Sequence, residues 1–226
     1  MVINAPSLAN IPLLDFPSQV QELYDAGVRF FHVDIMDGHY VPNLCFPTSL
    51  VGELKEKYPD CTVEVHLMVD DPFRYIDQMK ALGADWLSFH CDSTRFVRRG
   101  LTMIRDAGMR AGVVLNPSQQ VSVLEPYGQL LDYVVFMSVE PGFAGQKFLP
   151  GSMERLRELS AFRRRQGLSF SIIVDGGVSY ANAAEAVRAG ADALVTNIYM
   201  IFRQKDGITA ACQRFRRELE GVAADI

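Results

Sequence analysis

Features that would place a chain in a membrane or outside the cell are missing from this sequence. It has no apolar stretch of membrane-spanning length, and residues 1–6 lack the basic region and cleavage site of a signal peptide. Its four cysteines form no CxxC pair and no dense framework, which argues against a disulfide scaffold. We therefore expect a cytoplasmic protein with reduced thiols and no membrane partner.

Runs of like charge are also scarce. The net charge is −5, and the only Lys/Arg run that stands out is Arg163-Arg164-Arg165. This triplet lies in a predicted helix, where we expect it to form a solvated face. A nucleic-acid-binding domain typically carries a basic patch or stripe, so we expect no nucleic-acid partner.

The 226 residues contain no linker, low-complexity segment or shift of composition, so residues 1–226 are expected to form one domain. What the chain does contain is a regular alternation of short apolar runs with longer amphipathic runs. The apolar runs predict strands over Ile3–Ser7, Phe30–Met36, Thr62–Leu67, Trp86–His90, Ala111–Leu115, Tyr133–Ser138, Ser169–Asp175 and Ala193–Thr196.

The amphipathic runs lie between these strands, and several end in the Ala-Gly or Gly-Ala pairs that are typical of helix ends. Eight strand–helix units in a chain of this length indicate an α/β fold, a single (β/α)₈ TIM barrel. The alternative is a doubly wound sheet. The predicted helices are Ser18–Ala26, Thr48–Lys57, Pro72–Leu82, Thr94–Ala107, Val121–Glu125, Gly151–Gln166, Tyr180–Ala189 and Gly207–Glu220.

The segment from His32 to Asn43 is the most informative in the chain. It begins as a strand and ends in a loop rich in Gly, Pro and Asn. Alternate residues of a strand share one face, so His32, Asp34 and Met36 point the same way. This arrangement favours a metal site, since buried charges are usually paired or metal-bound. The alternative is a buried His–Asp pair that only fixes strand packing.

A second histidine and a second aspartate strengthen the metal hypothesis. His66 lies in the strand-like run Val63–Val69, and Asp175 ends the apolar run that precedes Gly176. All four candidate ligands therefore lie near the carboxyl ends of predicted strands, where barrel enzymes place their chemistry. Two imidazoles with two carboxylates suit one divalent ion, zinc first, with iron(II), manganese or cobalt(II) as alternatives.

Two glycine-rich segments indicate where an anion would bind. Gly142 and Gly145 follow the sixth predicted strand, and Gly176-Gly177 follow the seventh. Glycine lets backbone N–H groups turn toward an anion such as a phosphate ester, without requiring Lys or Arg. Glycine pairs after strands are also common as simple tight turns, and both interpretations remain open at this point.

Taken together, these motifs resemble the ribulose-phosphate 3-epimerase family, including the allulose-6-phosphate 3-epimerases, nearly from end to end. The resemblance implies a metal-dependent epimerase on a (β/α)₈ barrel. It rests on Ala5-Pro6-Ser7-Leu8, His32-Val33-Asp34-Ile35-Met36-Asp37-Gly38-His39-Tyr40-Val41-Pro42-Asn43, Val65-His66-Leu67-Met68-Val69, Leu115-Asn116-Pro117, Met137-Ser138-Val139-Glu140-Pro141-Gly142-Phe143-Ala144-Gly145-Gln146 and Val174-Asp175-Gly176-Gly177.

The resemblance also implies roles for individual residues. Asp34 and Asp175 would be the catalytic acid/base pair, and both would bind the metal together with His32 and His66. The remaining candidates would contact the substrate or its phosphate, as His66 would also do. They are Ser7, Met36, Met68, Met137, Gly142, Phe143, Ala144, Gly145, Gly176, Gly177, Asn197 and Ile198. The methionines are otherwise explained as packing at the rim of the barrel.

This chain departs from the family pattern after the eighth strand. Family members usually have a Gly followed by Ser or Thr there, but this sequence has Asn197-Ile198-Tyr199. Asn tolerates unusual backbone angles, so the turn can survive, but Ile198 offers no hydroxyl group. Pro47 also stands where a Gly is common among the pentulose enzymes. The departure concerns the phosphate pocket and therefore the choice of substrate.

The expected reaction is inversion at carbon 3 of a ketose phosphate, with ribulose 5-phosphate to xylulose 5-phosphate as the default. Two carboxylates suit this reaction, because a proton must leave one face of the carbon and return to the other. A divalent ion would stabilise the enediolate. The alternatives are a hexulose 6-phosphate of the allulose type, a differently substituted ketose, or a sensor that binds a sugar phosphate without turnover. Family members imply a homo-oligomer, a dimer or hexamer.

Overall fold

The apolar runs of the sequence form the strands of one sheet in the computed structural model, which describes residues 2–222. Every predicted strand is present, with small shifts at its ends. One short additional strand, β3, follows β2. The strands are β1 Ile3–Pro6, β2 Phe30–Asp37, β3 Leu44–Cys45, β4 Thr62–Met68, β5 Trp86–His90, β6 Arg110–Leu115, β7 Tyr133–Met137, β8 Ser171–Asp175 and β9 Ala193–Thr196.

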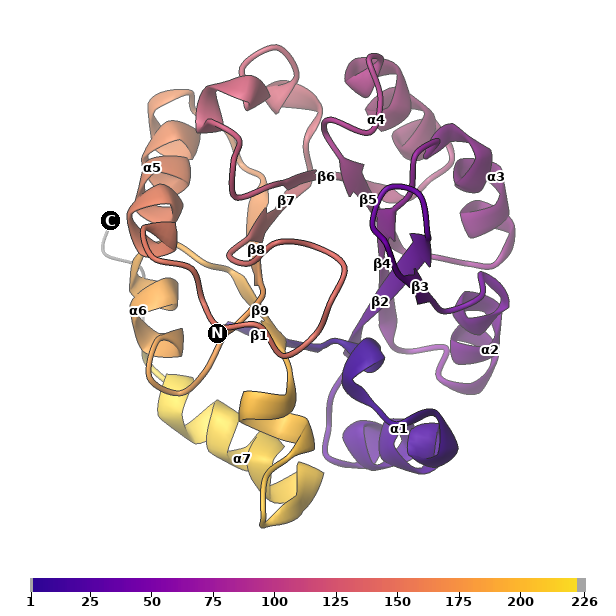
Figure 1. Ribbon diagram of the computed structural model, residues 1–226, viewed down its shortest axis with the longest axis vertical. Coiled ribbons are helices and arrows are strands. Elements are labelled where there is room, and N and C mark those ends of the chain that lie inside the picture. Colours follow the sequence, from indigo (N-terminus) through magenta and orange to yellow (C-terminus); the bar gives the residue numbers. More distant parts are fainter. Residues whose placement is uncertain (1, 223–226) are drawn as a thin grey trace.

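The sheet curls into a barrel (Figure 1). Its order is β1-β9-β8-β7-β6-β5-β4-β2-β3, and all neighbours pair in parallel except β3, which is antiparallel to β2. An isolated parallel bridge between Ser7 and His32 joins the β1 side of the sheet to β2. The predicted (β/α)₈ TIM barrel is therefore confirmed, and the doubly wound alternative is wrong.

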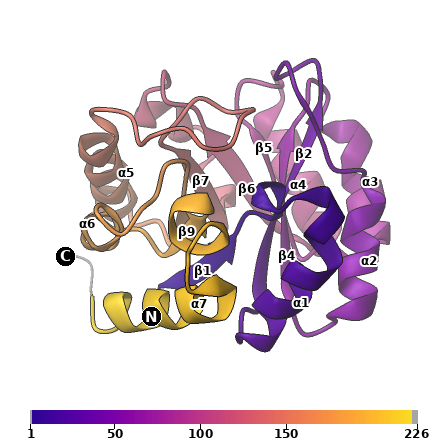
Figure 2. The ribbon, with the colours of Figure 1, turned by 60° about the horizontal axis from the view of Figure 1, so that its bottom comes forward.

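Helices cover the outside of the barrel (Figures 1 and 2). They are amphipathic; α7, for example, buries Ile208, Ala211, Phe215 and Leu219 at helical spacing in the large hydrophobic core. No helix among residues 2–222 is long and apolar enough to cross a membrane. The α-helices are α1 Phe16–Asp25, α2 Ser49–Lys57, α3 Phe73–Ala81, α4 Val97–Asp106, α5 Ser152–Arg165, α6 Ala183–Arg188 and α7 Gly207–Leu219.

Two local elements differ from the sequence-based prediction. The segment Val121–Leu124 forms a 3₁₀ turn rather than the expected α-helix, because Pro126 follows closely and cannot continue a helical hydrogen-bond pattern. A further 3₁₀ turn, Gly128–Leu130, completes the connection from β6 to β7. After β9 the chain forms a short π-helix over Ile198–Phe202, which the sequence did not predict.

Side-chain alternation separates the barrel interior from the layer beneath the helices. On β7, Tyr133, Val135 and Met137 belong to a small cluster inside the barrel, whereas Val134 and Phe136 belong to the large core between sheet and helices. On β2, likewise, every second residue (Phe31, Val33 and Ile35) packs into the outer core. His32, Asp34 and Met36 therefore share the interior face of the barrel.

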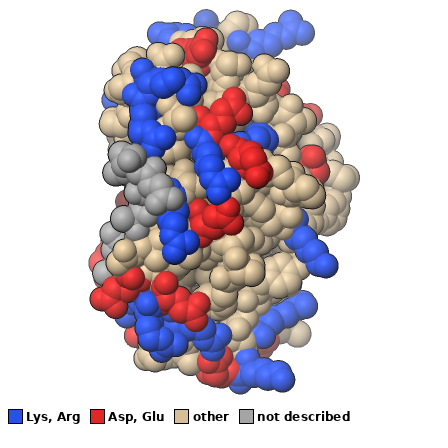
Figure 3. All heavy atoms as spheres, turned by 90° about the vertical axis from the view of Figure 1, so that its left-hand side faces the viewer, with Lys and Arg blue, Asp and Glu red and all other residues tan. Residues whose placement is uncertain are grey.

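The side of the barrel covered by α5 and α6 carries both signs of charge, interspersed (Figure 3). Arg157 pairs there with Glu185 at 2.5 Å. Arg163, in the basic triplet, is not simply solvated as expected. Its Nη1 donates to Asp192 Oδ2 at 2.6 Å and to the carbonyl of Phe170 at 2.9 Å. This arginine therefore ties α5 to the amino-terminal ends of β8 and β9.

Candidate metal centre and reaction cavity

Four polar side chains meet inside the barrel because of the register of its strands. In the pairing of β2 with β4, Asp34 lies opposite His66, and His32 lies opposite Glu64. Asp175 is the last residue of β8, which β9 and β1 separate from β2 around the barrel, and its side chain reaches the same place. The carboxyl ends of the strands thus bring together groups that are far apart in the sequence.

The side chains of His32, Asp34, His66 and Asp175 form one compact group, with one donor atom of each within 4.8 Å of the others. Asp34 Oδ1 lies 3.2 Å from His32 Nε2 and 3.3 Å from His66 Nδ1. Asp175 Oδ2 lies 3.7 Å and 3.6 Å from the same two nitrogens. All four side chains therefore direct donor atoms toward a common point.

This donor set fits a divalent metal ion. Two imidazole nitrogens with two carboxylate oxygens are ordinary ligands for zinc and for iron(II), manganese or cobalt(II). The Nδ1 atom of His66 is also fully buried and makes no hydrogen bond. A buried polar atom of this kind is usually paired, and a cation at the common point would pair it. Within residues 2–222, the four residues predicted as ligands form a group that could hold an ion.

The charges of the cluster are strongly linked. Burial opposes the charged form of His32, but the carboxylates of Glu64 and Asp34 outweigh it and raise its pKa well above the ordinary value. At His66, too, burial lowers the pKa, but the carboxylates of Asp175 and Asp34 outweigh burial and raise it. Burial would raise the pKa of Asp34, but His32 and His66 lower it far below its usual range. Protons and a metal ion would therefore compete for the same pair of imidazoles.

The two histidines present different ring nitrogens to the cluster and find different partners behind it. His32 points Nε2 inward, and its Nδ1 lies 2.5 Å from Glu64 Oε2. His66 points Nδ1 inward, and its Nε2 shares a hydrogen bond of 2.9 Å with Nε2 of His90. Burial, with His66 nearby, lowers the pKa of His90 well below its ordinary value, which keeps His90 neutral.

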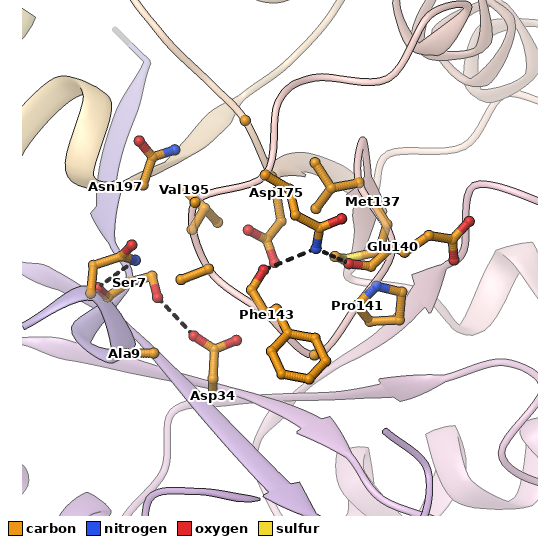
Figure 4. Close-up of a pocket in the computed structure, with 18 of the residues that line it drawn as sticks. Ser7, Ala9, Asp34, Met137, Glu140, Pro141, Phe143, Asp175, Val195 and Asn197 are labelled. Atoms are coloured by element: carbon orange, nitrogen blue, oxygen red, sulfur yellow. Dashed lines mark hydrogen bonds between the residues drawn. The ribbon is translucent and has the colours of Figure 1, made fainter. Parts of the chain in front are cut away.

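A cavity opens above the cluster at the carboxyl end of the barrel (Figure 4). The carboxylates of Asp34 and Asp175 both face it, and the Ser7 hydroxyl donates to Asp34 Oδ2 at 2.7 Å. The other predicted substrate-contacting residues in its lining are His66, Met36, Met68, Met137, Gly142, Phe143, Ala144, Gly145, Gly176, Gly177 and Asn197.

Two predicted residues lie outside this lining. His32 is fully buried behind Asp34. Ile198 lies instead beside Gly145, with its Cδ1 atom 3.6 Å from where a Cβ there would sit. The lining also includes residues that sequence reasoning did not select: Ala9, Asn10, Val139, Glu140, Pro141, Gln146, Val195 and Tyr199. The loop position of Gln146, inside the glycine-rich segment, was a signal that could have identified it.

The loop after β7 covers one side of the cavity and is held by its own polar groups. Gln146 donates from its side-chain amide to the carbonyls of Glu140 and Phe143, at 2.6 and 2.9 Å. The Asn43 amide donates to the Gly142 carbonyl at 2.8 Å, which links the loop after β7 to the loop after β2. The loop is therefore an ordered wall of the cavity.

Gly177 shows why glycine is required after β8. Its φ of +59° lies in the left-handed region, and a Cβ there would sit 2.2 Å from the backbone nitrogen of Phe148. The two glycine-rich loops thus pack backbone against backbone at the edge of the cavity. This close packing accounts for Gly177 without a ligand, and binding of an anion by these loops stays a prediction.

The segment after β9 is closed by its own side chains. Asn197 has an extended backbone (φ −144°), and its Oδ1 accepts a hydrogen bond of 2.8 Å from the N–H of Tyr199. Its Nδ2 donates to the carbonyl of Val178 at 3.1 Å. The Tyr199 hydroxyl donates to the carbonyl of Gly145 at 2.6 Å. Where the family has Gly-Ser/Thr, this chain thus uses Asn197 and the nearby Tyr199 to link the segment after β9 to the loops after β7 and β8.

Comparison with known proteins gives a consistent result. Residues 3–201 match the model of the "Ribulose-phosphate 3 epimerase family". The chain is 38% identical over 206 residues to the ribulose-phosphate 3-epimerase of Aquifex aeolicus, covering 91% of this chain and 92% of the relative. It is 35% identical over 202 residues to the ribulose-phosphate 3-epimerase of Escherichia coli K12, covering 89% of each.

Solved structures with low sequence identity share the fold. KGPDC from Streptococcus mutans superposes with a TM-score of 0.71 at 13% identity, covering 98% of this chain and 99% of that one. The 3-hexulose-6-phosphate synthase of Salmonella typhimurium gives a TM-score of 0.70 at 14% identity, covering 97% and 98%. At such identities the likeness establishes the barrel architecture alone.

Proposed function

Because this chain belongs to the ribulose-phosphate 3-epimerase family, we propose that it is a metal-dependent 3-epimerase that converts ribulose 5-phosphate to xylulose 5-phosphate. One observation carries the mechanistic part of this proposal. Asp34 and Asp175 belong to a four-residue group that could hold a metal ion, and both face one cavity. This geometry suits a reaction in which two carboxylates serve one substrate carbon.

The proposed mechanism assigns proton transfer to this pair. One carboxylate removes the proton from carbon 3, and the other returns a proton to the opposite face, which inverts the configuration. The Ser7 hydroxyl, hydrogen-bonded to Asp34 Oδ2, fixes one oxygen of that carboxylate. A divalent ion held by His32, Asp34, His66 and Asp175 would supply a Lewis acid for the negative charge that develops on the substrate oxygens.

The remaining lining residues would bind the substrate and exclude water. Met36, Met68 and Met137 give the cavity an apolar wall beside the carboxylates. Such a wall would shield the enediolate from bulk water. The backbone of the loops at Gly142–Gly145 and Gly176-Gly177 would hold the phosphate without a cationic side chain.

A hexulose 6-phosphate of the allulose type is the second candidate substrate, and a differently substituted ketose is the third. Both alternative substrates are retained because of the structure of the segment after β9. Asn197 caps the N–H of Tyr199 with its own side chain, and the Tyr199 hydroxyl binds the loop at Gly145. This arrangement changes the wall where the far end of the ketose would lie.

The proposal includes the zinc ion as first choice of metal, with iron(II), manganese or cobalt(II) as alternatives. It also includes assembly into a homo-oligomer, a dimer or hexamer, and a cytoplasmic location. Analytical ultracentrifugation at several protein concentrations would test the assembly. A single monomer mass throughout would contradict it.

Solvent exchange tests the reaction directly. Each ketose of a panel (ribulose 5-phosphate, allulose 6-phosphate and their unphosphorylated forms) is incubated with enzyme in deuterium oxide. We expect deuterium at carbon 3 of ribulose 5-phosphate together with its epimer, and loss of both after chelation. A protein that binds these ketoses but never exchanges carbon 3 would be a sensor, and the enzyme proposal would be wrong.

A further inference from the structure

We propose that Glu64 is a positioning residue that sets the ring orientation and tautomer of His32 and thereby raises the affinity of the metal centre. This inference rests on the metal site of the proposed function and adds a residue to it. Glu64 does not reach the cavity, and its side chain is completely buried. It lies in β4, opposite His32 in the pairing with β2.

A buried carboxylate needs partners, and those of Glu64 are well defined. Its Oε2 lies 2.5 Å from His32 Nδ1. Its Oε1 accepts hydrogen bonds of 3.1 Å from the Ser88 hydroxyl and 3.1 Å from the Tyr133 hydroxyl. Oε1 is therefore paired with two hydroxyl donors, whereas Oε2 lies close to the His32 ring without a hydrogen bond of regular geometry.

These supports come from other strands of the barrel, which hold the carboxylate rigidly. Ser88 lies in β5, and Tyr133 lies in β7, across the interior. The ring of Tyr133 occupies the space beside Gly112, where a Cβ would approach it to 2.5 Å. Burial and the Glu64 carboxylate raise the pKa of Tyr133 well above its ordinary value, so its hydroxyl keeps the proton that it donates. Glu64 thus sits at the centre of a polar network below the metal centre.

The position of the Glu64 carboxylate determines which ring nitrogen of His32 has a lone pair available to bind a metal ion. A carboxylate 2.5 Å from Nδ1 electrostatically favours the neutral tautomer of His32 that has its proton on Nδ1 and its lone pair on Nε2. Nε2 is the atom that faces Asp34 and Asp175, at 3.2 and 3.7 Å. A neutral His32 is therefore prepared to donate its lone pair toward the common point of the cluster.

The contrast with His66 shows that this partner is specific. Behind His66 stands another imidazole, that of His90, and not a carboxylate. A carboxylate partner makes a ligating imidazole more electron-donating than a neutral partner does. The two histidines would therefore contribute unequally, with His32 the stronger donor of the pair.

A purely structural role for Glu64 predicts a different outcome. If Glu64 only filled a polar gap in the barrel, its removal would lower stability in the same way as removal of Tyr133 or Ser88, and metal affinity would not change. Metal affinity therefore separates the two roles, and it is measured without any substrate.

The test compares Glu64→Gln with Tyr133→Phe as a matched control. Both changes alter the same buried network, but only the first removes the negative charge that faces His32. Zn²⁺ dissociation constants are measured on metal-free protein by competition with a chromogenic chelator. We expect Glu64→Gln to weaken Zn²⁺ binding by about 10- to 100-fold. Tyr133→Phe should stay close to wild type.

A second readout reports the ligand geometry. Co²⁺ is bound in place of Zn²⁺, and its visible absorption bands should shift in Glu64→Gln but not in Tyr133→Phe. Thermal unfolding of the metal-free variants checks folding. If Glu64→Gln does not fold, Glu64→Asp takes its place, because it keeps the charge but withdraws it from His32, and it should also weaken Zn²⁺ binding.

The outcomes separate the two proposals. A folded Glu64 variant with wild-type Zn²⁺ affinity and an unchanged Co²⁺ spectrum would overturn the role of Glu64 and leave the proposed function intact. Wild-type protein that binds no divalent ion would instead overturn the metal centre itself, and the role of Glu64 with it. Weaker binding in both Glu64→Gln and Tyr133→Phe by equal factors would assign the effect to the network and contradict a specific role for Glu64.

Discussion

At the scale of single residues, the decisive feature is that two carboxylates of the same cluster have different surroundings. Asp34 is almost fully buried and accepts the Ser7 hydroxyl at 2.7 Å, whereas Asp175 is somewhat more open to the cavity. The two groups also come from different strands, β2 and β8, which β1 and β9 separate around the barrel. This asymmetry suits two carboxylates that act on opposite faces of one carbon.

The change Asp175→Asn tests this assignment. Asn keeps the shape of the side chain and can still coordinate an ion, but it cannot accept the substrate proton. We expect turnover to fall by about 10²- to 10⁴-fold, the usual contribution of a general acid or base, with little change in the melting temperature. Epimerisation rate, metal content and thermal unfolding are measured on the same preparation.

The control is Asp71→Asn, which removes an exposed carboxylate just beyond β4 and should retain wild-type turnover. Near wild-type activity in Asp175→Asn would count against its role in proton transfer.

Sequence patterns could bring together the residues of the candidate metal centre because strand alternation and strand ends are local properties. His32 and Asp34 are two residues apart on one strand, and His66 and Asp175 fall at strand ends. The same alternation places Glu64 on the interior face with His66, so Glu64 could have been identified. Its contact with His32 could not, because that contact depends on the register between β2 and β4.

At the scale of elements, the loops after β7 and β8 are held together by the close approach of Gly177 to Phe148. The expected anion site at these loops therefore depends on a backbone contact that only glycine permits. The π-helix after β9 adds a third wall, since Tyr199 reaches the Gly145 carbonyl. Shape at this end of the cavity is thus set by loop-to-loop contacts.

The change Gly177→Ala should disturb this wall. The added Cβ meets the Phe148 backbone and forces the residue into an unfavourable region at φ +59°, so the loop after β7 must move. We expect the KM for ribulose 5-phosphate to rise by more than kcat falls, and stability to drop by about 1–3 kcal/mol. Steady-state kinetics and chemical denaturation measure these quantities.

Gly167→Ala is the matched control for backbone strain. Gly167 has a similar φ of +62°, but no atom lies within 4 Å of its added Cβ. It should lose stability without a rise in KM. Equal KM values in the two variants would contradict a role of the Gly177 contact in shaping the binding site.

Long periodic elements could be predicted from the sequence, whereas elements defined by unusual hydrogen bonds could not. Apart from the short strand β3, the strands and the α-helices follow from apolar periodicity. The π-helix over Ile198–Phe202 depends on the Asn197 carbonyl, which accepts from the N–H groups of Met200, Ile201 and Phe202. The sequence carries no periodic sign of such an arrangement, so the position of Ile198 beside Gly145 was missed.

At the scale of the whole molecule, the candidate metal centre would draw its ligands from β2, β4 and β8 and so would join distant parts of the chain. Binding of an ion to the folded state alone stabilises the protein, by about 2.7 kcal/mol at a free concentration one hundred times the dissociation constant. Chelation should therefore lower the melting temperature by several degrees.

The size of this effect should depend on pH. The pKa values of His32 and His66 are raised in the folded protein, so protonation of these rings stabilises metal-free protein below their unfolded value near 6.5. That stabilisation is lost as the pH rises through the raised values. Metal requires the neutral rings, so the gain in melting temperature from Zn²⁺ should grow as the pH rises from 6.5 upward.

Thermal unfolding across this pH range, with Zn²⁺ and with chelator, measures the difference. A gain from Zn²⁺ that is constant over the range would show that His32 and His66 do not take part in binding.

The two strands joined by the fewest backbone bridges, β1 and β2, lie beside the candidate metal centre. Between the first strand and the second, the ladder of the sheet shrinks to one bridge, Ser7 to His32. Asp175, at the end of β8, lies on one side of this junction between β1 and β2, and His32 and Asp34, in β2, lie on the other. A cation bound by these residues would connect the two sides of this junction, so we expect opening of the barrel at this point to release the ion.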